Sequence, residues 1–436
     1  MLYELPSILN PITPNWPQGI GSIPVMLSDG SVTDLPILEA NMLVTGTTGY
    51  GKTVFTKAAA RGRFDANPAL KGLFYQIKPD DFTSEFKKEG DKIITYSPYA
   101  DHPESHFKWN MVREIRQSSN HESEMKQLGT CLFSHLLEDE RNRLWAGAAR
   151  DTFIAFLRVI VECFGDCPSN GRIIQSMRTS GLVEMLKYLA RHPRNHSLLR
   201  NTFGFDPQNP DAKYKPPRKA EDVIFFLNDV LEMFSGNFAS FDAQDTIYDF
   251  LHGDKYQNLF IQHDVSQEEI SRPFELYFLK KIIDDKMSPS AKVSHPVLMV
   301  LDEVDKVGGD FGCTKAATLG RGYHLHLIVS TQSLENLFAL SPDKNREHTT
   351  NAMLAGFPVL VAFHGGDPGT ITSLQTMFGS KHRETTVLGI SRYAAPVTKN
   401  EREPIVTDTE FASLDIGECY VKMLSSPPQK VKIIMK

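Results

Sequence analysis

The sequence predicts an α/β fold in which a mostly parallel central sheet carries a phosphate-binding loop and receives an inserted all-α domain. Three observations predict it. An apolar strand at Met42 to Val44 runs into a glycine-rich loop at residues 46–53. Short apolar runs alternate with helix-like segments on either side, a spacing typical of parallel sheets. From about Arg116 to Asp245, helical periodicity replaces that alternation.

Composition places the chain among soluble globular proteins, since 41% of its 436 residues are hydrophobic and 23% are charged. That length suffices for two to three domains. The net charge of −6 does not indicate a nucleic-acid binder, so any DNA-binding surface must be local. No run reaches the roughly 18 apolar residues that a spanning helix needs.

The five cysteines are scattered and odd in number, and the pair at Cys163 and Cys167 lacks a second pair or a nearby histidine to complete a zinc site. We therefore expect reduced thiols, mostly buried, in a cytosolic protein.

The first part of the nucleotide-binding domain is expected at residues 1–115. Ile23 to Leu27 reads as a strand, and the Ser28 to Ser31 turn after it indicates a hairpin. Val54 to Arg61, after the glycine-rich loop, reads as a helix. Gly72 to Ile77 and Lys92 to Tyr96 are two further strands, apolar enough to be covered on both faces.

The inserted all-α domain is expected at residues 116–245. Four amphipathic helices are predicted in it: Glu122 to Leu137, Arg141 to Phe164, Leu182 to Ala190 and Ala220 to Phe234. Its 16 lysines and arginines against 17 acidic residues make it nearly neutral. Two basic stretches, Arg191 to Arg200 and Lys213 to Lys219, are either solvent-exposed faces or nucleic-acid contacts, and the first interpretation is favoured.

The second part of the nucleotide-binding domain is expected at residues 246–436, where strands return. They are predicted at Asn258 to Ile261, Pro296 to Leu301, His324 to Ser330, Pro358 to Phe363, Glu418 to Met423 and Gln429 to Ile434.

The loop Gly46-Thr47-Thr48-Gly49-Tyr50-Gly51-Lys52-Thr53 has the pattern of a complete phosphate-binding loop. Its glycines let successive backbone N–H groups converge on a triphosphate, Lys52 neutralises the β and γ phosphates, and Thr53 offers its hydroxyl to Mg²⁺. The positive end of the following helix faces the same anion. The loop thus predicts ATP and Mg²⁺ as ligands. Tyr50 either stacks near the base or covers the loop.

Asp302 and Glu303 complete the predicted nucleotide site, because they follow a buried strand at the sheet edge where open α/β sheets bind ligands. Asp302 would hold Mg²⁺, and Glu303 would orient or deprotonate the attacking water. Gln332, at the end of the next strand, could sense the γ phosphate. Arg321 is interpreted either as an arginine finger for a neighbouring subunit or as a surface residue in a glycine-flexed turn.

Together these motifs resemble those of the additional-strand hexameric translocases, and most closely the type IV coupling proteins of conjugative DNA transfer, which have a RecA-like fold. The resemblance covers about residues 35 to 430. Beyond the loop and the acidic pair, it rests on four stretches: Arg321 to Gln332, Lys78-Pro79-Asp80, Trp109-Asn110, and Leu144-Trp145-Ala146-Gly147-Ala148-Ala149-Arg150-Asp151.

The resemblance implies an ATP-driven translocase that brings DNA, or a relaxase–DNA complex, to a type IV secretion channel. It implies a hexamer with DNA in its central channel, and relaxase and channel components as partners. Trp145 and Arg150 would be structural or substrate-facing, and their amphipathic helix favours the core. Family members typically begin with membrane helices, which implies a removed anchor or a soluble member recruited by a partner to the cytoplasmic face of the inner membrane.

Two other functions stay open at the level of sequence. One is a soluble DNA-pumping ATPase of chromosome segregation or repair, which the Trp145 helix disfavours. The other is a nucleotide-binding receptor for secreted proteins, which the negative net charge favours.

Overall fold

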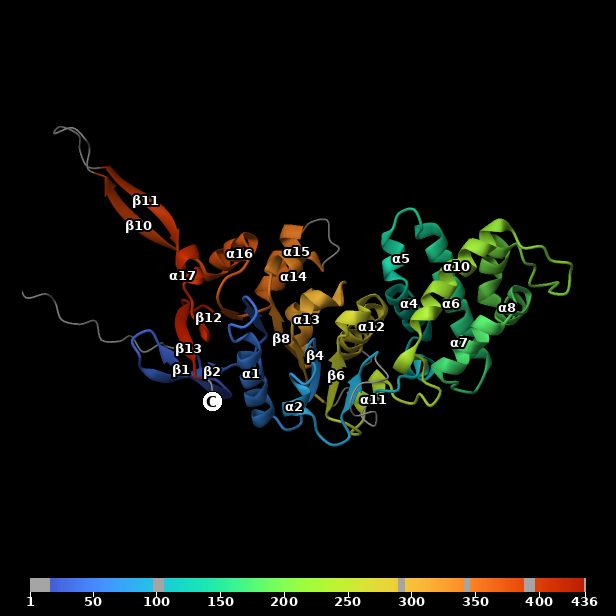
Figure 1. Cartoon of the computed structure of the whole chain (residues 1–436), viewed down its shortest axis with the longest axis horizontal. Helices are drawn as coiled ribbons and strands as arrows, with labels where there is room; N and C mark the ends of the chain where they lie inside the picture. Colours follow the sequence, from blue (N-terminus) through green and yellow to red (C-terminus); the bar gives the residue numbers. More distant parts are fainter. Residues whose placement is uncertain (1–15, 97–105, 289–294, 341–345, 388–396, 435–436) are drawn as a thin grey trace, which may run out of the picture. The chain divides into compact units, whose positions relative to one another are not determined.

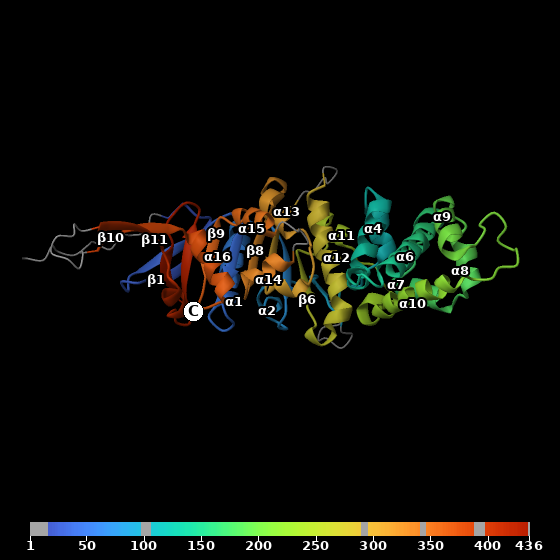
Figure 2. The same ribbon diagram turned by 90° about the horizontal axis from the view of Figure 1, so that it is seen from above.

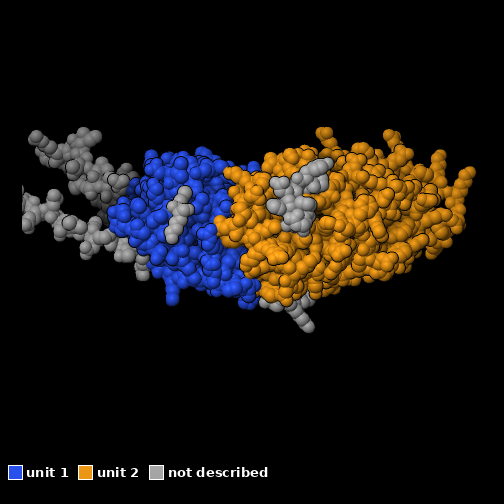
Figure 3. Space-filling view, turned by 60° about the horizontal axis from the view of Figure 1, so that its bottom comes forward, with its two compact units in different colours: residues 1–70, 297–306, 313–436 blue, residues 71–296, 307–312 orange. Residues whose placement is uncertain are grey.

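The computed structural model describes residues 16–96, 106–288, 295–340, 346–387 and 397–434. The chain divides into two compact units (Figure 3). Unit 1 comprises Met1–Leu70, Val297–Lys306 and Cys313–Lys436. Unit 2 comprises Lys71–Pro296 and Val307–Gly312.

Unit 1 is built on a mixed sheet with the strand order β2-β1-β13-β12-β9-β3-β8-β7. The strands β9, β3, β8 and β7 run parallel to one another, and the strands on the β12 side pair antiparallel. The bounds are β1 (Gly21–Leu27), β2 (Val32–Ile37), β3 (Met42–Thr45), β7 (Val297–Leu301), β8 (Leu325–Thr331), β9 (Val359–Ala362), β12 (Glu418–Met423) and β13 (Gln429–Ile433).

The parallel strands are apolar on both faces, as their sequence predicted: every residue of β3, β7, β8 and β9 is buried. The predicted hairpin forms at β1–β2, where Gly30 has a φ of 82° and the Asp29 carboxylate accepts from the Ser31 N–H at 2.9 Å. A second hairpin, β10 (Ser380–Val387) with β11 (Val397–Pro404), was not predicted (Figure 1). Its sequence is mostly polar and lacks apolar alternation.

The helices of unit 1 connect these strands. α1 follows the glycine-rich loop, and α14 and α16 begin at side-chain caps, Ser333 and Asp367. The bounds are α1 (Lys52–Ala66), α13 (Cys313–Leu319), α14 (Leu334–Ala339), α15 (Arg346–Ala355), α16 (Pro368–Phe378) and α17 (Asp408–Ala412), with 3₁₀ turns η6 (Val304–Val307) and η7 (Gly320–Tyr323).

Unit 2 combines three parallel strands, in the order β4-β6-β5, with many helices. The strands are β4 (Lys71–Gln76), β5 (Lys92–Ile94) and β6 (Asn258–Gln262). The helices are α2 (Thr83–Phe86), α3 (Met111–Gln117), α4 (His121–Leu132), α5 (Ser134–Glu138), α6 (Arg143–Cys163), α7 (Asn170–Thr179), α8 (Leu182–Leu189), α9 (His196–Leu198), α10 (Arg218–Met233), α11 (Ile247–His252) and α12 (Glu268–Lys286). The shorter turns are η2 (Pro193–Asn195), η3 (Leu199–Phe203), η4 (Gly236–Ala239) and η5 (Val265–Gln267).

Helix α6 is central to the helical part of unit 2, where it packs against α4 and α10 (Figures 1 and 2). Its second half is buried almost throughout, from Thr152 to Val161. The prediction that Trp145 and Arg150 lie in the core was wrong, since both are only half-buried while the small residues Ala146 and Ala149 beside them are fully buried. In the described residues, no helix combines the length and the apolar composition needed to cross a bilayer.

Buried polar contacts join helix α12 to α4, and helix α3 to the start of α11. Glu124 accepts hydrogen bonds from the Tyr277 hydroxyl and the Lys281 ammonium, both at 2.7 Å. The carboxylate of Glu114, fully buried, accepts from the indole of Trp109 at 3.3 Å and from the backbone N–H of Ile247 at 2.6 Å. Because buried polar groups require such partners, these contacts fix how α4 packs on α12 and how α3 packs on the start of α11.

The three-part division at residues 1–115, 116–245 and 246–436 stays a proposal. It is supported by the uninterrupted succession of helices from α3 to α11, between β5 and β6. The compact units follow other bounds, because β4, β5 and β6 group with those helices in unit 2.

Candidate functional site: a phosphate-binding loop facing two acids

The candidate site lies at the carboxyl ends of four neighbouring parallel strands of unit 1. Thr45, the last residue of β3, is paired with Thr331 of β8 and with Ala362 of β9. On the far side of β8, Leu301 of β7 pairs with Val329. Since β8 lies between the loop strand and the acidic strand, the sheet has the additional strand that the resemblance implied.

The glycine-rich loop follows β3 and turns into α1 through left-handed backbone at Gly46, Gly49 and Gly51, whose φ values are 141°, 89° and 113°. These angles exclude most side chains. Gly46 is also sterically required, because a Cβ there would lie 2.6 Å from the Cβ of Phe363. Lys52 is buried and donates to the Gly46 carbonyl at 2.6 Å, so its ammonium lies within the curve of the loop.

Asp302 meets the loop from the end of β7. The hydroxyl of Thr53 donates to Asp302 Oδ2 at 3.3 Å, although the two residues are 249 positions apart. Asp302 Oδ1 accepts from the hydroxyl of Ser330, a fully buried residue on β8. A hydroxyl and a carboxylate side by side are the oxygen ligands that Mg²⁺ takes in nucleotide sites, so these two side chains fit that ion.

Glu303 lies next to Asp302 and is half-buried, with a φ of 48°. Such left-handed backbone is strained for a residue with a side chain, and strain of this kind clusters at functional sites. Two contacts from the end of β8 hold it: the Glu303 N–H donates to Ser330 Oγ at 3.2 Å, and the Gln332 amide donates to Glu303 Oε1 at 2.6 Å. The predicted sensor residue therefore contacts the predicted base directly.

Tyr50 covers the loop by stacking on His364, with ring centroids 4.2 Å apart and planes 10° from parallel. His364 follows β9, and its carbonyl accepts from the Thr47 N–H at 3.0 Å. The Tyr50 carbonyl in turn accepts from the Gly417 N–H at 3.0 Å. Backbone hydrogen bonds thus join the loop to the residue that follows β9 by two positions and to the turn before β12. Thr48 is exposed beside it.

Arg321 is not brought to this site within the chain. It lies in η7, immediately before β8, and its side chain is exposed. In the part of the chain that the structure describes, no ion pair or side-chain hydrogen bond joins it to the loop or to the acidic pair.

Sequence reasoning missed three residues that shape the site: Ser330, Phe363 and His364. Ser330 could have been found, because in a strand residues 330 and 332 point to the same face, and Gln332 was already a candidate. Phe363 and His364 carried no such signal, since only the three-dimensional pairing of β9 with β3 brings them to the loop.

Comparison with known proteins assigns a family. The model of the type IV secretion-system coupling protein DNA-binding domain matches residues 35–434. No curated protein sequence is similar enough to match the chain.

Solved structures agree on the fold. The bacterial conjugative coupling protein TrwBdeltaN70 superposes with a TM-score of 0.69 at 17% identity, covering 91% of this chain and 85% of that one. The plasmid coupling protein TrwB in complex with ADP and Mg²⁺ gives 0.67 at 17% identity, covering 91% and 86%. VirB4 of Thermoanaerobacter pseudethanolicus gives 0.57 at 13% identity, covering 97% and 98%. The predicted RecA-like α/β fold is confirmed.

Proposed function

The chain belongs to the type IV secretion-system coupling protein DNA-binding domain family, and we propose from this premise that it is an ATP-hydrolysing DNA translocase of conjugation. In this role it brings DNA, or a relaxase–DNA complex, to a type IV secretion channel. Solved TrwB structures hold ADP with Mg²⁺ and a non-hydrolysable ATP analogue, which supports Mg·ATP as the nucleotide.

The observation that carries the proposal is the contact of Thr53 with Asp302, because it joins the phosphate-binding loop to the acidic strand across the sheet edge. The backbone N–H groups of residues 46–53 and the Lys52 ammonium bind the phosphates, and Tyr50 with His364 covers the loop. Thr53 and Asp302 hold Mg²⁺, which when bound neutralises charge on the phosphates.

Glu303 acts as the base that accepts a proton from the attacking water at its carboxylate. Its strained backbone and the hydrogen bond from Gln332 fix the direction in which the carboxylate points. Gln332 holds Glu303 in this way, and its amide responds when the phosphates occupy the loop. Arg321, exposed before β8, serves the nucleotide of a neighbouring subunit in a homo-hexamer.

DNA-stimulated phosphate release tests this function. Lys52→Ala should abolish turnover by removing phosphate binding, and Glu303→Gln should abolish turnover while ATP still binds. Arg321→Ala should leave ATP binding intact and lower turnover only under conditions where the protein assembles, as sized with and without ATP and DNA. Hydrolysis that persists in Glu303→Gln would remove that residue from the role of base.

Binding of DNA at increasing salt separates this function from that of a protein receptor. A DNA motor should lose affinity steeply with salt, because each neutralised phosphate releases bound counterions. Absence of DNA binding at low salt would refute the proposed translocase.

A further inference from the structure

A polar cavity of about 490 Å³ lies in the helical part of unit 2, and none of the nucleotide-binding residues belongs to its lining. It is lined from three sides by α4, by α6, and by the segment from Arg194 to Thr202. Four basic side chains belong to its lining: Lys126, Arg150, Arg158 and Arg194. Small-molecule sites have volumes of about 300 to 1,000 Å³, so the cavity is large enough for one nucleotide-sized ligand.

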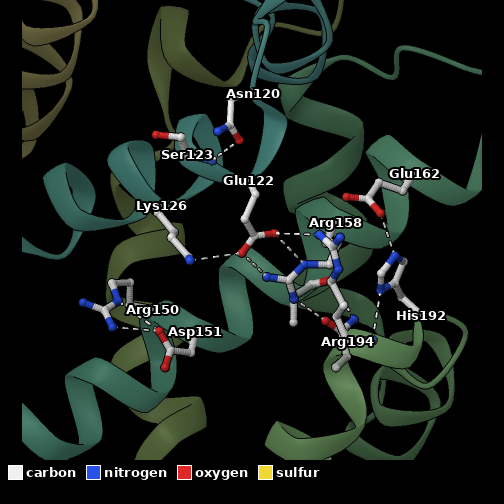
Figure 4. Close-up of polar contacts among 12 residues, drawn as sticks. Asn120, Glu122, Ser123, Lys126, Arg150, Asp151, Arg158, Glu162, His192 and Arg194 are labelled. Atoms are coloured by element: carbon white, nitrogen blue, oxygen red, sulfur yellow. Dashed lines mark hydrogen bonds and ion pairs between the residues drawn. The ribbon is translucent and has the colours of Figure 1, made fainter. Parts of the chain in front are cut away.

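The charges around this cavity do not balance. The carboxylate of Glu122 faces three cations: Arg158 at 2.8 Å, Lys126 at 3.5 Å and Arg194 at 3.8 Å (Figure 4). Arg150 is paired with Asp151. One acid against three bases, with the fourth base neutralised, leaves a surplus of two positive charges.

The three cations differ in how firmly they are held. Arg158 has only 11% of its side chain exposed and makes two hydrogen bonds to Glu122 and one to Asn195. It fixes the carboxylate in place. Lys126 and Arg194 have 65% and 64% of their side chains exposed, so both can turn from Glu122 towards a ligand.

Hydroxyl donors complete the lining, contributed by Thr130, Ser197 and Thr202. Asn201 donates to the Ser197 oxygen at 3.1 Å, which leaves the Ser197 proton available to an acceptor in the cavity. Asn201 and Thr202 lie on the π-helical turn η3, a conformation that is frequent at functional sites.

We propose that this cavity is a binding site for a dianionic phosphate group, with Lys126 and Arg194 as its mobile ligands. A phosphate monoester carries a charge of about −1.5 to −2 and three acceptor oxygens, which matches the surplus of two cations and the hydroxyl donors. A single carboxylate would leave one positive charge and most of the donors unmatched. The site is separate from the ATP site and goes beyond the proposed function.

Binding measurements in the 436-residue chain carrying Lys52→Ala test the site without interference from the phosphate-binding loop. The probes are inorganic phosphate, a nucleoside monophosphate, and a single-stranded oligonucleotide with either a phosphate or a hydroxyl at its 5′ end. We expect saturable binding of the phosphate-bearing probes. Lys126→Ala and Arg194→Ala should each weaken it about tenfold, as for the loss of one charge-assisted hydrogen bond.

Two matched variants sharpen the result. Arg200→Ala removes the same charge from an exposed position on η3 that does not line the cavity, and it should leave binding unchanged. Arg194→Lys should restore part of the affinity lost in Arg194→Ala. Both mobile cations are exposed, so these variants should fold, and circular dichroism checks this.

The probes also identify the source of the phosphate. Tighter binding of the phosphorylated oligonucleotide than of the hydroxyl form assigns the site to a strand end, and binding of the small probes alone assigns it to a free nucleotide or phosphate. Equal affinity for the two oligonucleotides combined with no loss in the alanine variants would overturn the proposal, as would binding of an acidic peptide in preference to every phosphate probe. Failure of the ATPase function alone would leave these results unchanged.

Discussion

Ser330→Ala tests whether β8 holds the two acids of the nucleotide site. The hydroxyl of this fully buried residue donates to Asp302 and accepts from the Glu303 N–H at 3.2 Å. A hydrogen bond to a charged group contributes about 1.5–3 kcal/mol and a neutral one about 0.5–1.5 kcal/mol. The substitution removes one of each, so we expect the free energy of unfolding to fall by about 2–4.5 kcal/mol.

The same change should raise the Mg²⁺ concentration needed for half-maximal ATP hydrolysis, because Asp302 loses the partner that orients its carboxylate beside Thr53. Urea unfolding measures the first effect and a Mg²⁺ titration at saturating ATP measures the second. A domain of ordinary stability, about 5–15 kcal/mol, survives a loss of this size, so the variant should be folded enough to assay.

Ser333→Ala is the control. Ser333 caps α14 from the same end of β8 and makes no contact with either acid, so its loss should cost about 1 kcal/mol of stability and leave the Mg²⁺ requirement unchanged. A Ser330→Ala protein whose unfolding free energy changes by less than about 0.5 kcal/mol, and whose Mg²⁺ titration matches that of the wild type, would contradict the role given to Ser330.

Three further predictions concern single residues. Gly46→Ala places a Cβ 2.6 Å from the Cβ of Phe363 at a φ of 141°, so ATP affinity measured by calorimetry should fall by more than tenfold. The control is Gly30→Ala, which has a φ of 82° but whose added Cβ meets no atom within 4 Å, and it should leave ATP affinity unchanged. Gln332→Ala should lower kcat by about 10- to 100-fold with little change in KM, because Glu303 loses its orienting hydrogen bond; a changed KM alone would contradict this. Burial raises the pKa of Glu114 from 4.5 to about 8, so between these two pH values the folded state binds more protons than the unfolded state. Thermal unfolding should therefore show stability falling as pH rises from 6 to 8, by at most about 1.4 kcal/mol per pH unit. Glu114→Gln should flatten this pH dependence.

The sequence allowed the phosphate-binding loop and the buried strands to be predicted because each is a local pattern. The glycines at 46, 49 and 51 require left-handed backbone, and apolar runs such as Val297–Leu301 can only be covered on both faces. The position of Asp302 beside Thr53 followed from a general rule on sheet edges rather than from the residues themselves.

What escaped prediction depends on distant pairing. His364 stacks on Tyr50 only because β9 lies beside β3, and the half-buried position of Trp145 depends on which side of α6 faces α4 and α10. The predicted helix from Glu122 to Leu137 is divided at Phe133 into α4 and α5, a local break that amphipathic spacing does not reveal.

The two contacts that β8 makes with the acids have a consequence for how this strand can vary. Ser330 and Gln332 are two residues apart and so share one face, while Thr331 between them points the other way and donates to Asp305 at 3.1 Å. Lengthening or shortening β8 by one residue would exchange the faces and release Asp302 and Glu303 together. A substitution at Ser330 or Gln332 removes only the contacts of that one residue, whereas a one-residue insertion or deletion within β8 removes the contacts of both residues at once.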